Sequence, residues 1–193
     1  MLDAADPHPN PQETLTAKIR AGDRAAFEAL FRAQYAPLCG FAHRYLRDRH
    51  AAEDLVQTLF ADLWADRSHL AIQTNVRAYL FAAVRNRALN IRKHELVERD
   101  WARDEALPEV RALHSRPRQP DAALEQQAME ASVADAMESL PERCRMVMRL
   151  RWQEQMRYAE IAQVMGISVK GVENQLARGL RALRVRLTGS AGD

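Results

Sequence analysis

The chain has 193 residues and a formal net charge of +2. This length accommodates one large domain or two small ones, and the near-neutral charge excludes a bulk polyanion binder. Cys39 and Cys144 lack CxxC or His–Cys spacing, which favours two ordinary, partly buried thiols over a disulfide or a zinc site. With no signal peptide and no apolar run of about 18 residues, we expect a cytoplasmic protein without a membrane span.

The composition predicts an all-α protein, because Ala, Leu, Arg, Glu and Gln dominate and no long alternating run suggests a strand. We expect a disordered N-terminus over 1–13, where three prolines fall close together. Two small helical domains are expected over 14–95 and 124–187. A flexible linker over 96–123 joins them, because prolines and mixed charges interrupt the pattern there, and 188–193 form a tail.

The first domain is expected to contain four helices. A helix over Leu15–Ala21 stops at Gly22, which tolerates a left-handed backbone, and Asp23 caps the next helix. That helix starts near Arg24, and Pro37 is expected to kink or interrupt it.

A third helix is predicted over Ala51–Trp64 and a looser segment over Asp66–Thr74. The fourth helix is predicted from Asn75 to beyond Arg92. Its inward face is expected to consist of five apolar residues: Val76, Leu80, Val84, Leu89 and Ile91.

In the second domain, one helix ends before Pro141 and another covers Glu142–Trp152. The apolar positions of the helix before Pro141 are Met129, Val133, Met137 and Leu140.

A helix-turn-helix is predicted at the end of the second domain. The helix Tyr158–Met165 ends at Gly166, Ile167 follows as a buried plug, and Ser168 caps the next helix. One face of that helix is apolar, with Val172, Leu176, Leu180, Leu183 and Leu187. The opposite face is polar and basic, with Lys170, Glu173, Asn174, Gln175, Arg178 and Arg181. Such a face fits the major groove of DNA.

Four blocks of sequence follow one another in a recognisable order: AAEDLVQTLFADLW from Ala51, VRAYLFAAVRNRALNIRK from Val76, LPERCRMVMRLRW from Leu140, and YAEIAQVMGISVKGVENQLARGLRALR from Tyr158. In this order they resemble the extracytoplasmic-function (group IV) class of bacterial RNA polymerase sigma factors. The first domain resembles region two of that family and the second resembles region four. The resemblance implies promoter recognition and DNA opening for core RNA polymerase, with no cofactor.

The resemblance assigns polymerase binding to the third helix, which docks on the clamp helices of the largest subunit in the family. The matching positions are Asp54, Gln57, Phe60, Leu63 and Trp64. Phe60 and Trp64 suit either partner contact or core packing. The resemblance also implies binding to the flap of the second largest subunit.

By the same resemblance, the fourth helix reads the −10 promoter element. Asn86 matches an asparagine that lines a pocket for an unstacked base, and the neighbouring polar residues would hold the single strand. These neighbours are Arg85, Arg87, Asn90, Arg92 and Lys93. Asn86 and Asn90 also suit ordinary surface polarity, while Tyr79 and Phe81 suit either base stacking or helix packing.

The resemblance assigns the −35 element to the recognition helix. The candidate contacts are Ser168, Lys170, Asn174, Arg178 and Arg181. Glu173 departs from the family, where a basic residue is common; a carboxylate cannot bind phosphate but can accept from cytosine N4. Gly171 and Gly179 are expected to weaken this helix by up to about 1 kcal/mol each.

The segment VENQLARGL most resembles the branch of the family whose members often work with a membrane-anchored anti-sigma factor. This resemblance implies such a partner. No HExxH, Gly-rich phosphate loop or nucleophile elbow is present, so we expect no catalytic residue and no metal site. The main alternative is a stand-alone helix-turn-helix regulator that binds duplex DNA, and a second is a decoy that binds polymerase without opening DNA. The Asn86 helix and the docking helix, with its acidic start at Glu53 and Asp54, favour a sigma factor over a stand-alone regulator, whereas only the Asn86 segment argues against a decoy.

Overall fold

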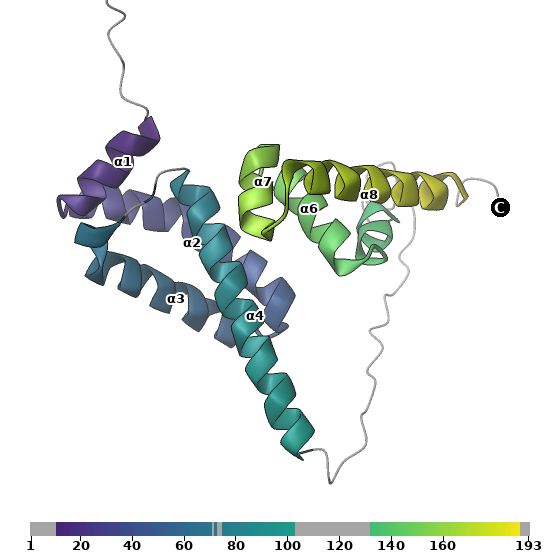
Figure 1. The fold of residues 1–193 in the computed structure, drawn as a ribbon, viewed down its shortest axis with the longest axis horizontal. Coiled ribbons are helices and arrows are strands. Elements are labelled where there is room, and N and C mark those ends of the chain that lie inside the picture. The colour runs from purple at the N-terminus through teal and green to yellow at the C-terminus, as the bar shows by residue number, and fades with distance from the viewer. Residues whose placement is uncertain (1–10, 71, 73–74, 103–131, 190–193) are drawn as a thin grey trace, which may run out of the picture. The chain divides into compact units, whose positions relative to one another are not determined.

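The computed structural model describes residues 11–70, 72, 75–102 and 132–189, and within these ranges every regular element is a helix (Figure 1). The chain forms two compact units, one with the helices up to Arg99 and one with most of the helical residues from 132 onward. The prediction of an all-α protein with two helical domains is confirmed. Three longer stretches lie outside the described ranges: 1–10, 103–131 and 190–193. They include most of the predicted N-terminal, linker and tail segments, and also Met129.

The first unit starts with α1 (Pro11–Arg20) and α2 (Arg24–Leu46). Helix α1 begins four residues before the predicted Leu15 and inside the segment predicted as disordered, because proline suits the first turn of a helix. Gly22 adopts a φ of +83° between them, and the Asp23 carboxylate accepts a hydrogen bond from the Ala26 N–H at 3.0 Å. Both features match the sequence prediction. Pro37 was predicted to kink or interrupt this helix; α2 continues through Pro37, so an interruption is wrong. Pro37 leaves the carbonyl of Ala33 without a helical donor, but Ala33 is exposed and water can solvate that carbonyl.

Helix α3 (Arg49–Ala65) begins two residues before the predicted start, because the Asp48 carboxylate caps it through the Ala51 N–H at 3.1 Å. A short 3₁₀ helix, η1 (Arg67–His69), follows. Helix α4 (Val76–Ala102) extends past Arg92 into the segment predicted as a linker. The core of the unit is formed by α2, α3 and α4, with Leu38, Val56 and Leu80 among its fully buried side chains.

In the second unit, a helical segment over 132–138 precedes α6 (Glu142–Trp152). Helices α7 (Tyr158–Met165) and α8 (Val169–Gly189) form the helix-turn-helix. The predicted bounds of α6 and α7 agree with the structure. Cys144, Val147 and Leu150 are fully buried on α6, and α6 packs on α8.

Candidate functional site

Helix α4 has a buried face and an exposed polar face. The buried positions are Val76, Ala78, Leu80, Phe81, Val84 and Ala88. Leu89 and Ile91 are only half-buried, so the expected inward face is wrong at these two positions. Phe81 is fully buried with its ring 5.0 Å from that of Phe41, which excludes it from base stacking, while Tyr79 is 37% exposed.

The predicted −10 residues differ in how far they reach solvent. Asn86, Asn90 and Lys93 are exposed, and their spacing of four and three residues places them on one side of α4. The three arginines of the group, Arg85, Arg87 and Arg92, are half-buried.

Two of these arginines contact neighbouring side chains. The Arg87 guanidinium lies 2.8 Å from the Asp62 carboxylate and ties α4 to α3. The Arg85 guanidinium donates to Asn86 Oδ1 at 3.5 Å. The exposed amides of Asn86 and Asn90, with the Lys93 ammonium, are therefore the groups most open to a strand of nucleic acid.

The predicted docking residues on α3 separate into surface and core positions. Asp54 and Gln57 are exposed. Phe60 and Leu63 are buried, with only 3% and 4% of their surfaces exposed. These two side chains pack inside the unit, so they are not part of a surface that a partner can touch. Trp64 is half-buried, with the Phe27 ring 4.8 Å away and the Arg67 guanidinium 4.6 Å from its ring centroid.

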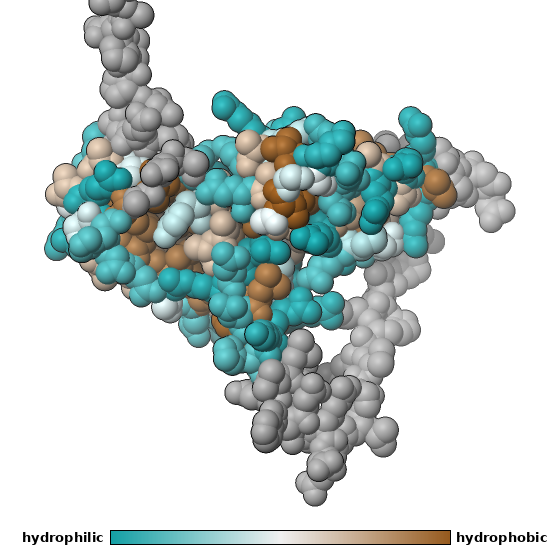
Figure 2. Space-filling model, in the orientation of Figure 1, coloured by the Kyte–Doolittle hydropathy of each residue, from teal (hydrophilic) through white to brown (hydrophobic). Residues whose placement is uncertain are grey.

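A group of aromatic rings from α2 lies against α3. No function was predicted for these rings from the sequence. Phe27 packs 4.8 Å from Trp64, Phe31 packs 4.8 Å from Phe60, and Phe31 stacks 4.9 Å from Tyr35. Apolar surface is visible as brown patches over the α2 and α3 part of the molecule (Figure 2). These ring contacts pack α2 against the part of α3 that carries Phe60 and Trp64.

The turn of the helix-turn-helix has the predicted chemistry. Gly166 has a φ of +60°, and the Ile167 N–H donates to the Ala162 carbonyl at 3.1 Å, the long hydrogen bond that closes a helix with a left-handed residue. Ser168 Oγ accepts from the Gly171 N–H at 3.0 Å and caps α8. Ile167 is half-buried, so it is a less complete plug than predicted.

The predicted −35 residues all lie on the surface of α8. Ser168, Lys170, Asn174, Arg178 and Arg181 are exposed. Their spacing along the helix places Lys170, Asn174 and Arg178 on one face. The Lys170 ammonium pairs with the Glu173 carboxylate at 2.9 Å. Glu173, the residue that departs from the family pattern, therefore offsets the charge of a lysine predicted to contact a base.

The apolar face of α8 is buried only in its first half. Val172 and Leu176 are buried, but Leu180 is 50% exposed, contrary to the predicted stripe. At this turn Gly179 takes the buried position: an added Cβ would lie 2.1 Å from Met148 Sδ and 3.1 Å from Cys144 Sγ. Cys144 Sγ also donates to the Gln175 carbonyl at 3.0 Å, so α6 and α8 meet closely here.

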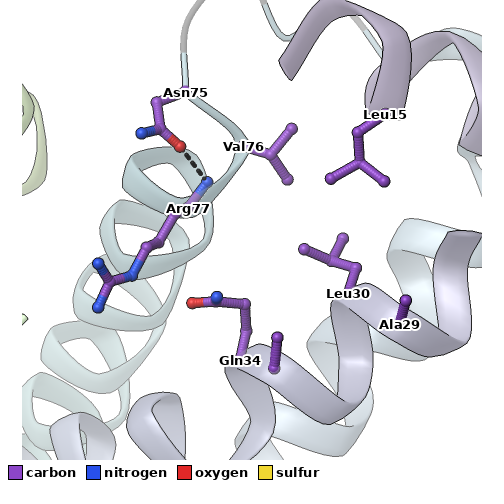
Figure 3. Close-up of a pocket in the computed structure, with 8 residues that line it drawn as sticks. Leu15, Ala29, Leu30, Gln34, Asn75, Val76 and Arg77 are labelled. Atoms are coloured by element: carbon purple, nitrogen blue, oxygen red, sulfur yellow. Dashed lines mark hydrogen bonds between the residues drawn. The ribbon is translucent and has the colours of Figure 1, made fainter. Parts of the chain in front are cut away.

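A pocket of about 410 Å³ opens in the first unit between α1, α2 and the start of α4 (Figure 3). Leu15, Leu30 and Val76 form apolar wall, and Gln34 points toward α4. Asn75 caps this end of α4 by accepting from the Arg77 N–H at 2.8 Å. The pocket lies roughly 14 Å along α4 from Asn86, at 1.5 Å per residue, so it is separate from the predicted base-binding residues.

Within the described ranges, no cluster of His, Cys, Asp or Glu has the makeup of a metal site. The two cysteines are free, and burial raises the pKa of both thiols. No described helix is both long and apolar enough to cross a membrane.

Two family models match the chain: sigma-70 region 2 over residues 30–95 and sigma-70 region 4 over residues 130–183. The RNA polymerase sigma-E factor of Streptomyces coelicolor is 32% identical over 86% of this chain and 88% of its own length. The chain belongs to the sigma factor family of RNA polymerase. The extracytoplasmic-function sigma factor SigW of Bacillus subtilis is 22% identical over 88% of this chain and 93% of its own length, in keeping with that class.

The fold of this sigma factor also resembles a solved structure. The sigma factor RpoE of Bartonella quintana, solved in complex with the anti-sigma factor NepR, aligns with a TM-score of 0.60 and 19% identity, over 84% of this chain and 96% of that one. The predicted fold class and the prediction of a sigma factor are confirmed, and a stand-alone regulator is not favoured. Sigma factors contribute binding rather than bond chemistry to transcription.

Proposed function

We propose that this sigma factor, of the group IV branch, reads the −10 promoter element with its first unit and the −35 element with its second. The observation that supports this division is the presence of two exposed polar faces, one on α4 and one on α8, each backed by buried apolar residues. A regulator that binds only duplex DNA would need the second face alone.

On α4, Asn86 binds the edge of a base that leaves the stack when the DNA opens. Unstacking a base costs a few kcal/mol, and a protein offsets this cost with hydrogen bonds to the base and cations along the strand. Asn90 and Lys93 lie on the same side as Asn86 and extend the contact along the strand. Arg85, Arg87 and Arg92 support it from half-buried positions.

On α8, the capped N-terminus and Ser168 meet a phosphate, while Lys170 and Asn174 reach base edges. Arg178 and Arg181 follow on the exposed side of the helix and contact a base or the backbone. The Lys170 ammonium has three N–H donors, so it can donate to a base while it pairs with Glu173, and the Glu173 carboxylate can accept from a neighbouring cytosine.

Docking on core polymerase uses the exposed part of α3. The clamp helices of the largest subunit bind the exposed Asp54 and Gln57 and the half-buried Trp64. Phe60 and Leu63 support this surface from beneath without touching the partner. The second unit binds the flap of the second largest subunit.

The further partner is an anti-sigma factor, membrane-anchored as in the related branch, with the sigma factor itself in the cytoplasm. Support comes from the Bartonella quintana neighbour, which was solved with its anti-sigma factor. Co-purification from membranes and from cytosol, each with crosslinking, would identify this partner and its location.

The proposed function is tested by run-off transcription with purified bacterial core polymerase, on the DNA upstream of this protein's own gene. We expect a discrete transcript that appears only when the protein is added. No transcript together with no co-elution with core polymerase would contradict the proposal and favour a stand-alone regulator. No transcript with clear co-elution would point instead to another promoter or to a decoy, which a promoter library would distinguish.

A further inference from the structure

The exposed Gln57 side chain of α3 is held by a residue of α2. Gln57 Nε2 donates a hydrogen bond to the Tyr35 hydroxyl oxygen at 3.2 Å, across the packing of α2 on α3. A free glutamine side chain samples many rotamers, and ordering it costs up to about 2 kcal/mol. This bond therefore selects one orientation for the carboxamide, with Oε1 left for another donor.

The ring of Tyr35 is itself fixed in place. It stacks on Phe31 with the ring centroids 4.9 Å apart and the planes inclined by 29°. Phe31 in turn packs edge-on against the buried Phe60, with centroids 4.8 Å apart. The chain of contacts runs from the core of the unit to the exposed amide, so the position of the Tyr35 hydroxyl is set by core packing rather than by solvent.

We infer that Tyr35 is a positioning residue for polymerase binding, which holds the Gln57 carboxamide in its binding orientation through a hydroxyl that core packing fixes. The inference rests on the proposed docking of α3. A group that is ordered before binding loses less conformational entropy in the complex, so the hydrogen bond strengthens binding without contact between Tyr35 and the polymerase.

The experiment measures the dissociation constant of full-length protein and core polymerase for Tyr35→Phe, Gln57→Ala and the double variant. Phenylalanine keeps the stacked ring and removes only the hydroxyl. We expect Tyr35→Phe to weaken binding about twofold to tenfold, the range of one hydrogen bond. Gln57→Ala should weaken binding at least as much, and the double variant should be no weaker than Gln57→Ala alone.

Two controls separate positioning from loss of structure. The melting temperature of Tyr35→Phe should stay close to that of the unchanged protein, because the ring contacts remain. Tyr35 also hydrogen-bonds with Cys39, a contact that partly offsets the rise that burial causes in the pKa of that thiol. Cys39→Ala removes this second contact of the hydroxyl and should leave polymerase binding unchanged.

The outcomes distinguish the inference from the docking on which it rests. If Gln57→Ala binds polymerase normally, the proposed role of Gln57 is wrong and the inference fails with it. If Gln57→Ala weakens binding but Tyr35→Phe does not, docking stands and the positioning role is overturned. Additive losses in the double variant would also overturn it, because Tyr35 would then act independently of Gln57.

Discussion

Gly179 has no side chain at the point where α8 packs most closely on α6. Its backbone lies so near Met148 and Cys144 that a methyl group would overlap the Met148 sulfur. Both of those residues are buried, so they have little space into which to move. In an isolated helix glycine lowers helix stability, but here it permits the close packing of α8 on α6 that supports the recognition face.

We predict that Gly179→Ala destabilises the second unit by about 1–3 kcal/mol, the usual effect of overpacking, despite the higher helix propensity of alanine. Gly171→Ala is the matched control: its Cβ would meet neighbours no closer than 3.4 Å, so it should be neutral or stabilising by up to about 1 kcal/mol. Urea unfolding of the three proteins measures both effects. Equal stabilisation by the two substitutions would show that the α6–α8 contact has room for a methyl group.

Single residues also mark the boundary of what the sequence could predict. Gly166, Ser168 and Asp23 were assigned correctly because a turn or a cap depends on chemistry within a few residues. Phe60 and Phe81 were left open between surface and core, and both are buried by residues distant in the chain. Periodicity identifies an apolar residue but not the neighbours that cover it, so Tyr35 and Gly179 could not be assigned from sequence.

At the scale of elements, the segment 132–138 is joined to α6 by charge. The Glu138 carboxylate pairs with both Arg145 and Arg149 of α6. Burial by itself would raise the pKa of Glu138, but Arg149 and then Arg145 outweigh it, and the pKa lies below its ordinary value. A carboxyl group whose pKa is lower in the folded state adds stability above its unfolded pKa and loses it as the pH falls through the folded value.

We predict that Glu138→Gln lowers the free energy of unfolding near pH 7 by at most about 1 kcal/mol, because the carboxylate is more than half exposed. The difference from the unchanged protein should shrink as the pH falls from about 4.5, the ordinary value, through the lowered pKa of Glu138. Asp135→Asn, which removes an exposed acid of the same segment, controls for the loss of one negative charge. A difference that stays constant with pH would argue against a role for the charge of Glu138.

Element boundaries were predicted well in α6 and α7, although the local cap at Asp48 that starts α3 was overlooked. They were also missed where a tertiary or solvent effect decides. Helix α2 continues through Pro37 because the carbonyl freed by proline lies on an exposed side. Helix α4 continues to Ala102 although its apolar pattern fades earlier.

At the scale of the whole molecule, a near-neutral chain contains two stretches in which cations far outnumber acids. Residues 77–93 contain five cations and no acid: Arg77, Arg85, Arg87, Arg92 and Lys93. Residues 166–186 contain five cations and one acid: Lys170, Arg178, Arg181, Arg184, Arg186 and Glu173. These stretches coincide with the two proposed DNA faces, one in each unit, so binding of promoter DNA should depend on salt even though the net charge is small.

We predict that the affinity of the holoenzyme for promoter DNA falls steeply between about 50 and 200 mM salt, because each cation that contacts a phosphate releases counterions. The exposed Arg178 is a direct probe: Arg178→Gln should reduce the slope of log affinity against log salt by about 1. Arg24→Gln removes an exposed cation outside both stretches and should leave the slope unchanged, so it controls for net charge. Fluorescence anisotropy with labelled promoter duplex gives all three slopes. If the two variants change the slope equally, net charge rather than the α8 face governs the salt dependence, and the assignment of Arg178 to a phosphate contact fails.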